Sequence, residues 1–281
     1  MAPSRSAAAP APLTPLTHLY LYDEPEAAGL SIEALAAYLA AVLPACEVLT
    51  RRDFFTHHLA RFSDEQREVL GEQLMVQLQR VRVDNLVPPD FRLLLPIDPP
   101  DESEWGEVYH APSLQAVLRL LLPPEEEHLS HLHLVCTELV LGTWPGGDQP
   151  LELLPALFGE PNLLSIPGLL EGLRPAREYE FLRVQMAMFG LEEGLDAVED
   201  RFAGQMLSEA DPRLNQVLEG FALQAVFYRL YGEAFCLEPT CRLFNATNFE
   251  ELLAAQTGPG TGLCARHREW LRELGAAPER A

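Results

Sequence analysis

A spaced set of cysteine and histidine residues near the C-terminus constrains this chain most strongly. Four residues separate Cys236 from Cys241 and two separate Cys264 from His267, and both pairs fall within 32 positions. Structural zinc takes four soft or borderline ligands in a tetrahedron, and two short loops from different chain segments can supply them. The array therefore predicts one structural zinc ion, held by three thiolates and one imidazole.

The ligand spacing also predicts what this ion would connect. Pro239 lies inside the first pair, and glycines precede the second, so both loops contain the bend that chelation needs. The ion would tie the helix before Cys236 to a C-terminal helix that begins near His267. His267 is the weakest of the four expected ligands, because an acid or a water could replace it. The alternative interpretation, three ordinary buried thiols beside a surface histidine, leaves the paired spacing unexplained.

The other cysteines and the N-terminus indicate the compartment. Cys46 and Cys136 lie alone on expected strands and are interpreted as small core residues. Five cysteines in 281 residues do not make a secreted disulfide framework. Residues 1–16 are proline-rich, lack the apolar stretch of a signal peptide, and are interpreted as a flexible leader. We therefore expect reduced thiols and a cytoplasmic protein.

The charge of the chain excludes some classes of partner. Lys and Arg number 20 and Asp and Glu 42, which gives a formal net charge of −22. An excess of acid this large argues against nucleic acid or an anionic membrane as the partner. No apolar run approaches the roughly 18 residues of a membrane span. A peptide or another protein remains as the expected partner.

Hydrophobic periodicity predicts an α+β protein whose N-terminal half resembles an α/β arrangement. Strands are expected at residues 17–22, 46–50 and 131–144, and helices at residues 32–43, 63–81 and 113–122. This alternation favours a mixed sheet with flanking helices. We assign residues 17–206 to this scaffold.

A long amphipathic helix follows the scaffold. Apolar residues recur at intervals of three or four from Leu214 to Tyr228, and Gly232 stands where a helix C-terminus favours glycine. Residues 207–275 are therefore expected to form this helix and a helical subdomain tied by zinc. The subdomain is either separate from residues 17–206 or continuous with them.

At this point the sequence resembles the archaemetzincin metallopeptidases. Their motif is HExxHxxGxxHCxxxxCxM followed by CxxC, and the matching positions here are Gly232, Cys236, Cys241 and the later CxxH. Weaker likenesses lie at residues 136–139 and 158–165, so the resemblance spans about residues 130–270. It implies that the long helix is the active-site helix of a metzincin.

The same register shows a departure from the peptidase motif. Ala225 and Val226 take the HE positions, Arg229 takes that of the second histidine and Phe235 that of the third. In HExxH chemistry the histidines hold zinc and the glutamate activates its water, which none of these side chains can do. We expect packing to fill the vacated position, and a carboxylate to pair with Arg229.

These observations lead to three hypotheses about function. The first is a non-catalytic, zinc-stabilised relative of metallopeptidases, a pseudoenzyme that binds a peptide or protein. The second is an active zinc metallopeptidase whose ligands do not align, such as His128, His131 and His133. The third is a partner-binding scaffold of unrelated fold with a zinc knuckle.

The histidines outside the array also have structural interpretations. His131 and His133 alternate with leucines and are expected to line one face of a strand. His57 and His58 follow two phenylalanines and are interpreted as a surface or packing pair.

Overall fold

The computed structural model describes residues 11–23, 29–77, 80–82, 107–143, 152–173, 177–191 and 194–274. The larger sheet contains β1 (His18–Asp23), β2 (Glu47–Arg52), β5 (His131–Thr137), β8 (Ala156–Leu157) and β9 (Asn162–Ser165). The smaller sheet contains β3 (Arg80–Arg82), β4 (Glu107–His110), β6 (Val140–Thr143) and β7 (Glu152–Leu153).

Helices make up much of the remaining described chain. They are α1 (Ile32–Val42), α2 (Phe54–Leu59), α3 (Asp64–Gln77), α5 (Ala111–Leu120), α6 (Ile166–Gly172), α7 (Arg177–Met188), α8 (Leu195–Phe202), the short 3-10 helix η3 (Ala203–Gln205), α9 (Leu214–Tyr231), α10 (Phe249–Thr257) and α11 (Ala265–Glu273). A search of the described helices for one long and apolar enough to cross a membrane found none.

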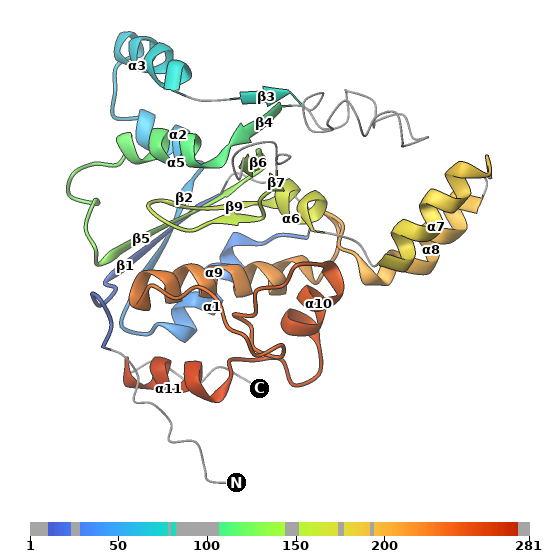
Figure 1. Cartoon of the computed structure of the whole chain (residues 1–281). Helices are drawn as coiled ribbons and strands as arrows, with labels where there is room; N and C mark the ends of the chain where they lie inside the picture. Colours follow the sequence, from blue (N-terminus) through green and yellow to red (C-terminus); the bar gives the residue numbers. More distant parts are fainter. Residues whose placement is uncertain are drawn as a thin grey trace.

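The larger sheet is mixed and has the strand order β2-β1-β5-β9-β8. Strands β2, β1, β5 and β9 run parallel, whereas β8 pairs antiparallel with β9 at the edge. Helices lie above and below this sheet in Figure 1. The expected α+β class, a mixed sheet with flanking helices, is confirmed.

Alternation along β1 explains why both faces of the sheet are covered. Leu19 and Leu21 point into a core with α1 and α9, whereas Tyr20 and Tyr22 pack into a second core with α2 and α5. Strand β1 is thus buried on both faces. Strand β2, at the other edge, is only half-buried.

The chain from residue 131 onward differs from the single strand that was expected. Strand β5 ends at Thr137, and β6 joins the other sheet two residues later. Two side chains fix the break: Thr137 Oγ1 accepts from Leu139 N at 3.2 Å, and Ser165 Oγ donates to Leu139 O at 2.6 Å. Alternating hydrophobicity continues across the break, so periodicity alone did not detect it. Residue 144, the end of the expected strand, lies outside the described residues.

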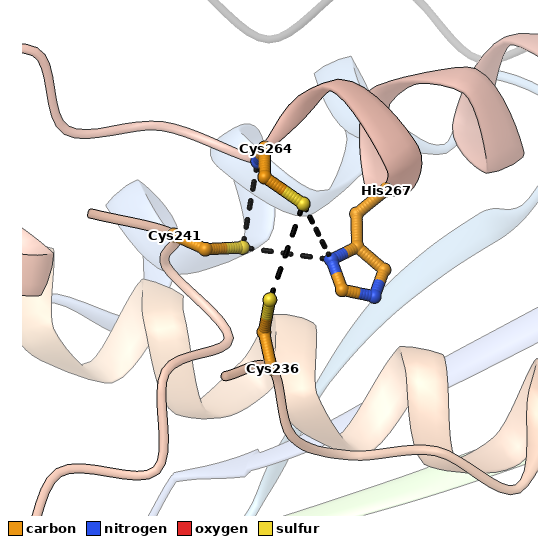
Figure 2. Close-up of side chains that lie close together, drawn as sticks. All are labelled: Cys236, Cys241, Cys264 and His267. Carbon is orange, nitrogen blue, oxygen red and sulfur yellow. Dashed lines mark hydrogen bonds between the residues drawn. The ribbon is translucent and has the colours of Figure 1, made fainter. Parts of the chain in front are cut away.

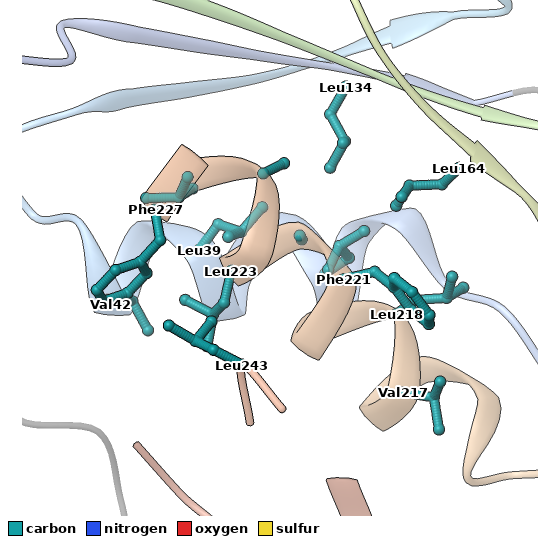
Figure 3. Packing of buried hydrophobic residues seen from close by; sticks show 14 of the residues in the cluster. Leu39, Val42, Leu134, Leu164, Val217, Leu218, Phe221, Leu223, Phe227 and Leu243 are labelled. Carbon is teal, nitrogen blue, oxygen red and sulfur yellow. The ribbon is translucent and has the colours of Figure 1, made fainter. Parts of the chain in front are cut away.

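Helix α9 is the central element of the larger core. It runs beneath the sheet, between the strands and the C-terminal helices (Figure 1). Its apolar side chains belong to the same core as Leu39, Leu134 and Leu164 (Figure 3). Gly232 ends it in the left-handed conformation with φ 72°, as the glycine position predicted. The mixed sheet therefore lies beside α9, which contacts β5.

Gly220 allows α10 to pack closely against α9. A Cβ atom at this position would lie 2.0 Å from Gln256 Oε1. The helix therefore keeps a glycine in its interior, although glycine disfavours helix formation.

Part of the expected leader is described. Residues 1–10 lie outside the described residues. Farther along, Leu13 N donates to Leu230 O at 2.7 Å, and Leu16 is buried in the larger core. These contacts hold the chain just before β1 against the end of α9.

Candidate metal centre

The four residues of the cysteine–histidine array come together just beyond the end of α9. Cys236 and Cys241 lie on the loop that follows Gly232, Cys264 caps α11, and His267 lies in the first turn of α11 (Figure 2). Backbone hydrogen bonds set the loop: Cys236 N donates to Leu243 O at 2.7 Å, and Cys241 N to Glu238 O at 3.0 Å. The second bond closes a tight turn that directs both thiols toward α11.

The distances between the ligand atoms fit a small tetrahedral ion. All four ligand atoms lie within 4.8 Å of one another. Cys236 Sγ is 4.0 Å from Cys264 Sγ, and His267 Nδ1 is 3.5 Å from Cys241 Sγ and 3.2 Å from Cys264 Sγ. Zinc bond lengths in a regular tetrahedron give edges of about 3.8 Å between two sulfurs and about 3.6 Å between sulfur and nitrogen. The donor set is therefore spaced for a metal ion with such bonds.

Backbone amides support thiolates at this site. Glu238 N donates to Cys236 Sγ at 3.3 Å, and Cys264 N donates to Cys241 Sγ at 3.4 Å. Such hydrogen bonds stabilise negative charge on sulfur ligands. Burial acts in the opposite direction and raises the pKa of the Cys241 thiol to about 12. A metal ion must therefore displace the proton, and its binding is expected to weaken as pH falls.

Aromatic packing joins the centre to α9. The His267 ring meets Phe227 of α9 and Trp270 of α11, each at 5.1 Å between centroids and edge to face. Tyr231 Oη donates to Trp270 O at 3.1 Å. Phe227 and Tyr231 of α9 therefore contact α11 beside His267.

Arg242 is a buried charged residue that no sequence pattern predicted. Its guanidinium bonds Tyr38 Oη at 2.9 Å, Glu219 Oε2 at 3.1 Å, Gln256 Oε1 at 3.2 Å and Gln216 O. The side chain thus ties the metal-binding loop to α1, α9 and α10. A charged residue between Cys241 and the apolar Leu243 was the available signal, but its partners come from three distant segments.

The residues at the vacated HExxH positions have different surroundings. Ala225 and Val226 are fully buried in the larger core. Arg229 pairs with Glu160 at 3.6 Å and donates to His128 O at 3.0 Å and His131 O at 3.2 Å. The expected carboxylate partner of Arg229 is confirmed.

The expectation that Phe235 fills a closed space is wrong. Its side chain is 47% exposed and packs edge to face on Phe158 at 5.8 Å. Ala234 and Cys236 on either side of it are buried, and the Phe235 ring lies between them on the surface of the loop.

The histidines of β5 lie on one face of the sheet, as alternation predicted. His131 meets Tyr20, and His133 is buried beside Tyr20 and Tyr22. Within the described residues, the only cluster of three or more ligand atoms that could hold a metal is the Cys3His set.

His133 and His58 belong instead to a buried hydrogen-bond network. His133 Nε2 donates to Glu126 O at 3.2 Å, so its Nδ1 accepts from Tyr22 Oη at 2.9 Å. His58 Nε2 then donates to the same phenol at 2.8 Å, as does Arg51 Nη1 at 2.9 Å. Both imidazoles are uncharged in this arrangement, and each is a packing residue.

This network predicts that acid destabilises the protein. Burial lowers the pKa of His58 to about 3 and that of His133 to about 4. The unfolded chain takes up these protons below about pH 6.5 and the folded chain does not, so stability falls between about pH 6.5 and pH 4. Each histidine is expected to contribute roughly 1–2 kcal/mol of this loss at pH 5.

Denaturant unfolding at pH 7 and pH 5 measures this dependence. His133→Asn is expected to reduce the difference between the two pH values, whereas the exposed control His128→Gln leaves it unchanged. Acid release of a metal ion affects all three proteins equally and cancels in the comparison. An identical pH dependence in wild type and His133→Asn would contradict the prediction.

A large cleft of about 1290 Å³ lies beside α9, and Phe235 and Phe244 of the cysteine-bearing loop are among its lining residues. Its walls come from β7, β8, the C-terminal part of α6, the α7–η3 segment, α9 and the start of α10. Phe221 and Gln224 of α9 line it, as does the exposed ring of Phe235. The edge strand β8 borders this cleft.

Comparison with known proteins identifies a family for this chain. A family model described as a probable metallopeptidase family (DUF6775) matches residues 16–274. No curated protein and no solved structure matches the chain significantly. The matched range includes both sheets, α9 and all four residues of the Cys3His cluster.

Proposed function

Because the chain belongs to the probable metallopeptidase family DUF6775, we propose that it is a non-catalytic member that holds one structural zinc ion and binds a peptide or protein. The environment of α9 carries this proposal. A catalytic zinc needs imidazole or carboxylate ligands facing an open position. Here Ala225 and Val226 are sealed in the core, and the cation Arg229 is bound to Glu160 and two carbonyl oxygens.

The resemblance to archaemetzincins supports the same proposal in finer detail. In that register α9 corresponds to the active-site helix, and the Cys3His cluster to the cysteine array that follows it. Three thiolates and one imidazole are the ligands that zinc prefers over harder cations. When bound, the ion would leave no ligand position open to water and would stabilise the fold. The free thiols of this set favour the reducing cytoplasm.

The cleft beside α9 supports peptide binding. Its lining combines apolar and polar residues, as the linings of ligand sites do. The antiparallel strand β8 lies at the edge of the larger sheet in the described part of the chain and lines this cleft. An extended peptide can pair with such an edge strand through its backbone.

Metal stoichiometry and hydrolysis assays test the proposal together. Purified protein is expected to hold one zinc ion per chain, lost in Cys236→Ser and retained in the control Cys46→Ser. It should not hydrolyse unstructured peptides when zinc, cobalt or manganese is added. Native mass spectrometry and a fluorogenic peptide assay measure these outcomes.

A different result would favour the active metallopeptidase. Two zinc ions per chain, one of them lost in His131→Ala, would indicate a second metal site. Metal-dependent hydrolysis that a chelator abolishes, and that persists through further purification, would refute the non-catalytic assignment.

A further inference from the structure

Gln224 lines the cleft beside α9 and carries a buried, unsatisfied acceptor. The residue lines the cleft, although its side chain is 97% buried, with a relative exposure of 3%. Its Nε2 donates to Phe244 O at 3.3 Å, which fixes the orientation of the amide because a carbonyl oxygen only accepts. The Oε1 atom is buried and has no hydrogen-bond partner in the described structure. A buried acceptor of this kind is stabilised by a ligand that brings a donor.

The charges at the cleft select the kind of donor. Four glutamates line it, Glu152, Glu171, Glu178 and Glu250, and no arginine or histidine is among the described lining residues. Glu178 is paired with Arg201 of α8 at 2.6 Å. Glu152 lies on β7 and Glu250 on α10, so negative charge comes from two different elements of the wall. The cleft therefore favours a cation over an anion.

Aromatic rings supply the remaining part of the site. Phe158, Phe221, Phe235 and Phe244 line the same cleft. The half-exposed ring of Phe235, set edge to face on Phe158, is open to a ligand. Aromatic faces attract ammonium and guanidinium groups, and they also pack against the methylene stems of long basic side chains. An arginine or lysine side chain matches all three features.

From this combination we infer that the cleft binds a peptide segment carrying a basic side chain, with the cationic head beside Gln224 Oε1 and the wall glutamates and the stem on the phenylalanines. The inference rests on the proposed peptide-binding function and adds the class of ligand. Acidic and uncharged segments of the same length are discriminated against, because they leave Gln224 Oε1 unpaired or bring like charges together.

Fluorescence anisotropy with two matched probes tests the inference on the full, metal-loaded chain. One probe is a fluorescein-labelled peptide of glycine, serine and alanine with a central run of arginine. The other replaces each arginine with citrulline, which keeps the shape and removes the charge. The arginine probe is expected to bind roughly tenfold more tightly, and its advantage should shrink as salt is raised.

Variants distinguish binding in the cleft from attraction of the probe by the overall negative charge of the protein. Glu152→Gln with Glu250→Gln is expected to weaken binding of the arginine probe roughly tenfold and to leave the citrulline probe unchanged. The matched control, Glu65→Gln with Glu68→Gln on α3, removes two exposed charges on the other side of the sheet and should change neither affinity. Gln224→Met removes the acceptor at similar volume and should weaken the arginine probe. Thermal melting verifies that each variant is folded.

The outcomes distinguish this inference from the proposed function. Equal affinity for both probes, with both weakened by Gln224→Met, would keep peptide binding in the cleft and overturn the basic specificity. Equal loss in the cleft and α3 variants would show attraction by net charge alone, and would also overturn it. Binding of neither probe at millimolar concentration would refute this inference and count against peptide binding itself.

Discussion

Removal of the metal ion, by exhaustive chelation or by Cys241→Ser, is expected to abolish the ordered packing of residues 232–270. Metal binding to structural zinc sites supplies about 10–16 kcal/mol in small peptides. Residues 232–270 contain little sheet structure, and three thiols and an imidazole converge at their centre. We therefore expect a loss of at least about 5 kcal/mol in unfolding free energy.

The loss of ordered structure after metal removal is expected to differ between parts of the chain. The face of the larger sheet that packs on α2 and α5 has its own core, and its described members include none of the four Cys3His residues. Amide hydrogen exchange should therefore rise most between Cys236 and His267 and least in β1 and β5. The half-buried Cys46 lies outside the cluster, and Cys46→Ser is expected to cost less than about 1 kcal/mol. An unchanged melting temperature after chelation would show that no structural metal is present.

Replacement of Arg242 by methionine is expected to have the second-largest effect. The Arg242 side chain is buried, and its guanidinium is shared among Tyr38, Glu219, Gln256 and a backbone oxygen of α9. Methionine fills much of the volume but leaves the carboxylate of Glu219 without this cation. Loss of one partner of a buried pair costs about 3–5 kcal/mol.

The controls for Arg242→Met separate charge from packing. Arg272→Met removes a guanidinium from the exposed face of α11, where it pairs with Glu269, and should change stability by less than about 1 kcal/mol. Adding Glu219→Gln to Arg242→Met is expected to recover part of the loss, because the carboxylate that Arg242 no longer neutralises is gone. Zinc content is measured in each variant, since Arg242 adjoins Cys241. Wild-type stability in Arg242→Met with zinc retained would contradict the prediction.

Much of the fold was predictable because its signals are local. The apolar spacing from Leu214 to Tyr228 and the glycine at position 232 predicted α9 and its end. The alternation in β1 placed leucines on one face and tyrosines on the other. In each case the spacing of apolar residues within one short segment matches the repeat of a helix or of a strand. Only that type of secondary structure places these apolar residues on a common face.

The sequence also named the four residues that the structure brings together beyond α9. Chelating pairs are close in sequence, so each half of the cluster could be recognised from spacing alone. The paired spacing also implied that the halves meet. The position of the cluster beneath Phe227 and Trp270 depended on how α9 and α11 pack.

Other features were decided only by tertiary structure. The break between β5 and β6 depends on Ser165, which follows Leu139 by many residues, and the role of Arg242 depends on partners in α1, α9 and α10. Phe235 is exposed, and the cleft beside Gln224 is open, because no other described segment packs over these residues. Sequence periodicity indicates which face of a helix or strand is apolar. The β5–β6 break, the contacts of Arg242 and the cleft depend instead on which distant segment packs against that face, and on how closely it packs. The sequence by itself therefore determined the long helix α9, the alternation of β1 and the candidate Cys3His set, and long-range packing decided the cleft and the buried charge network.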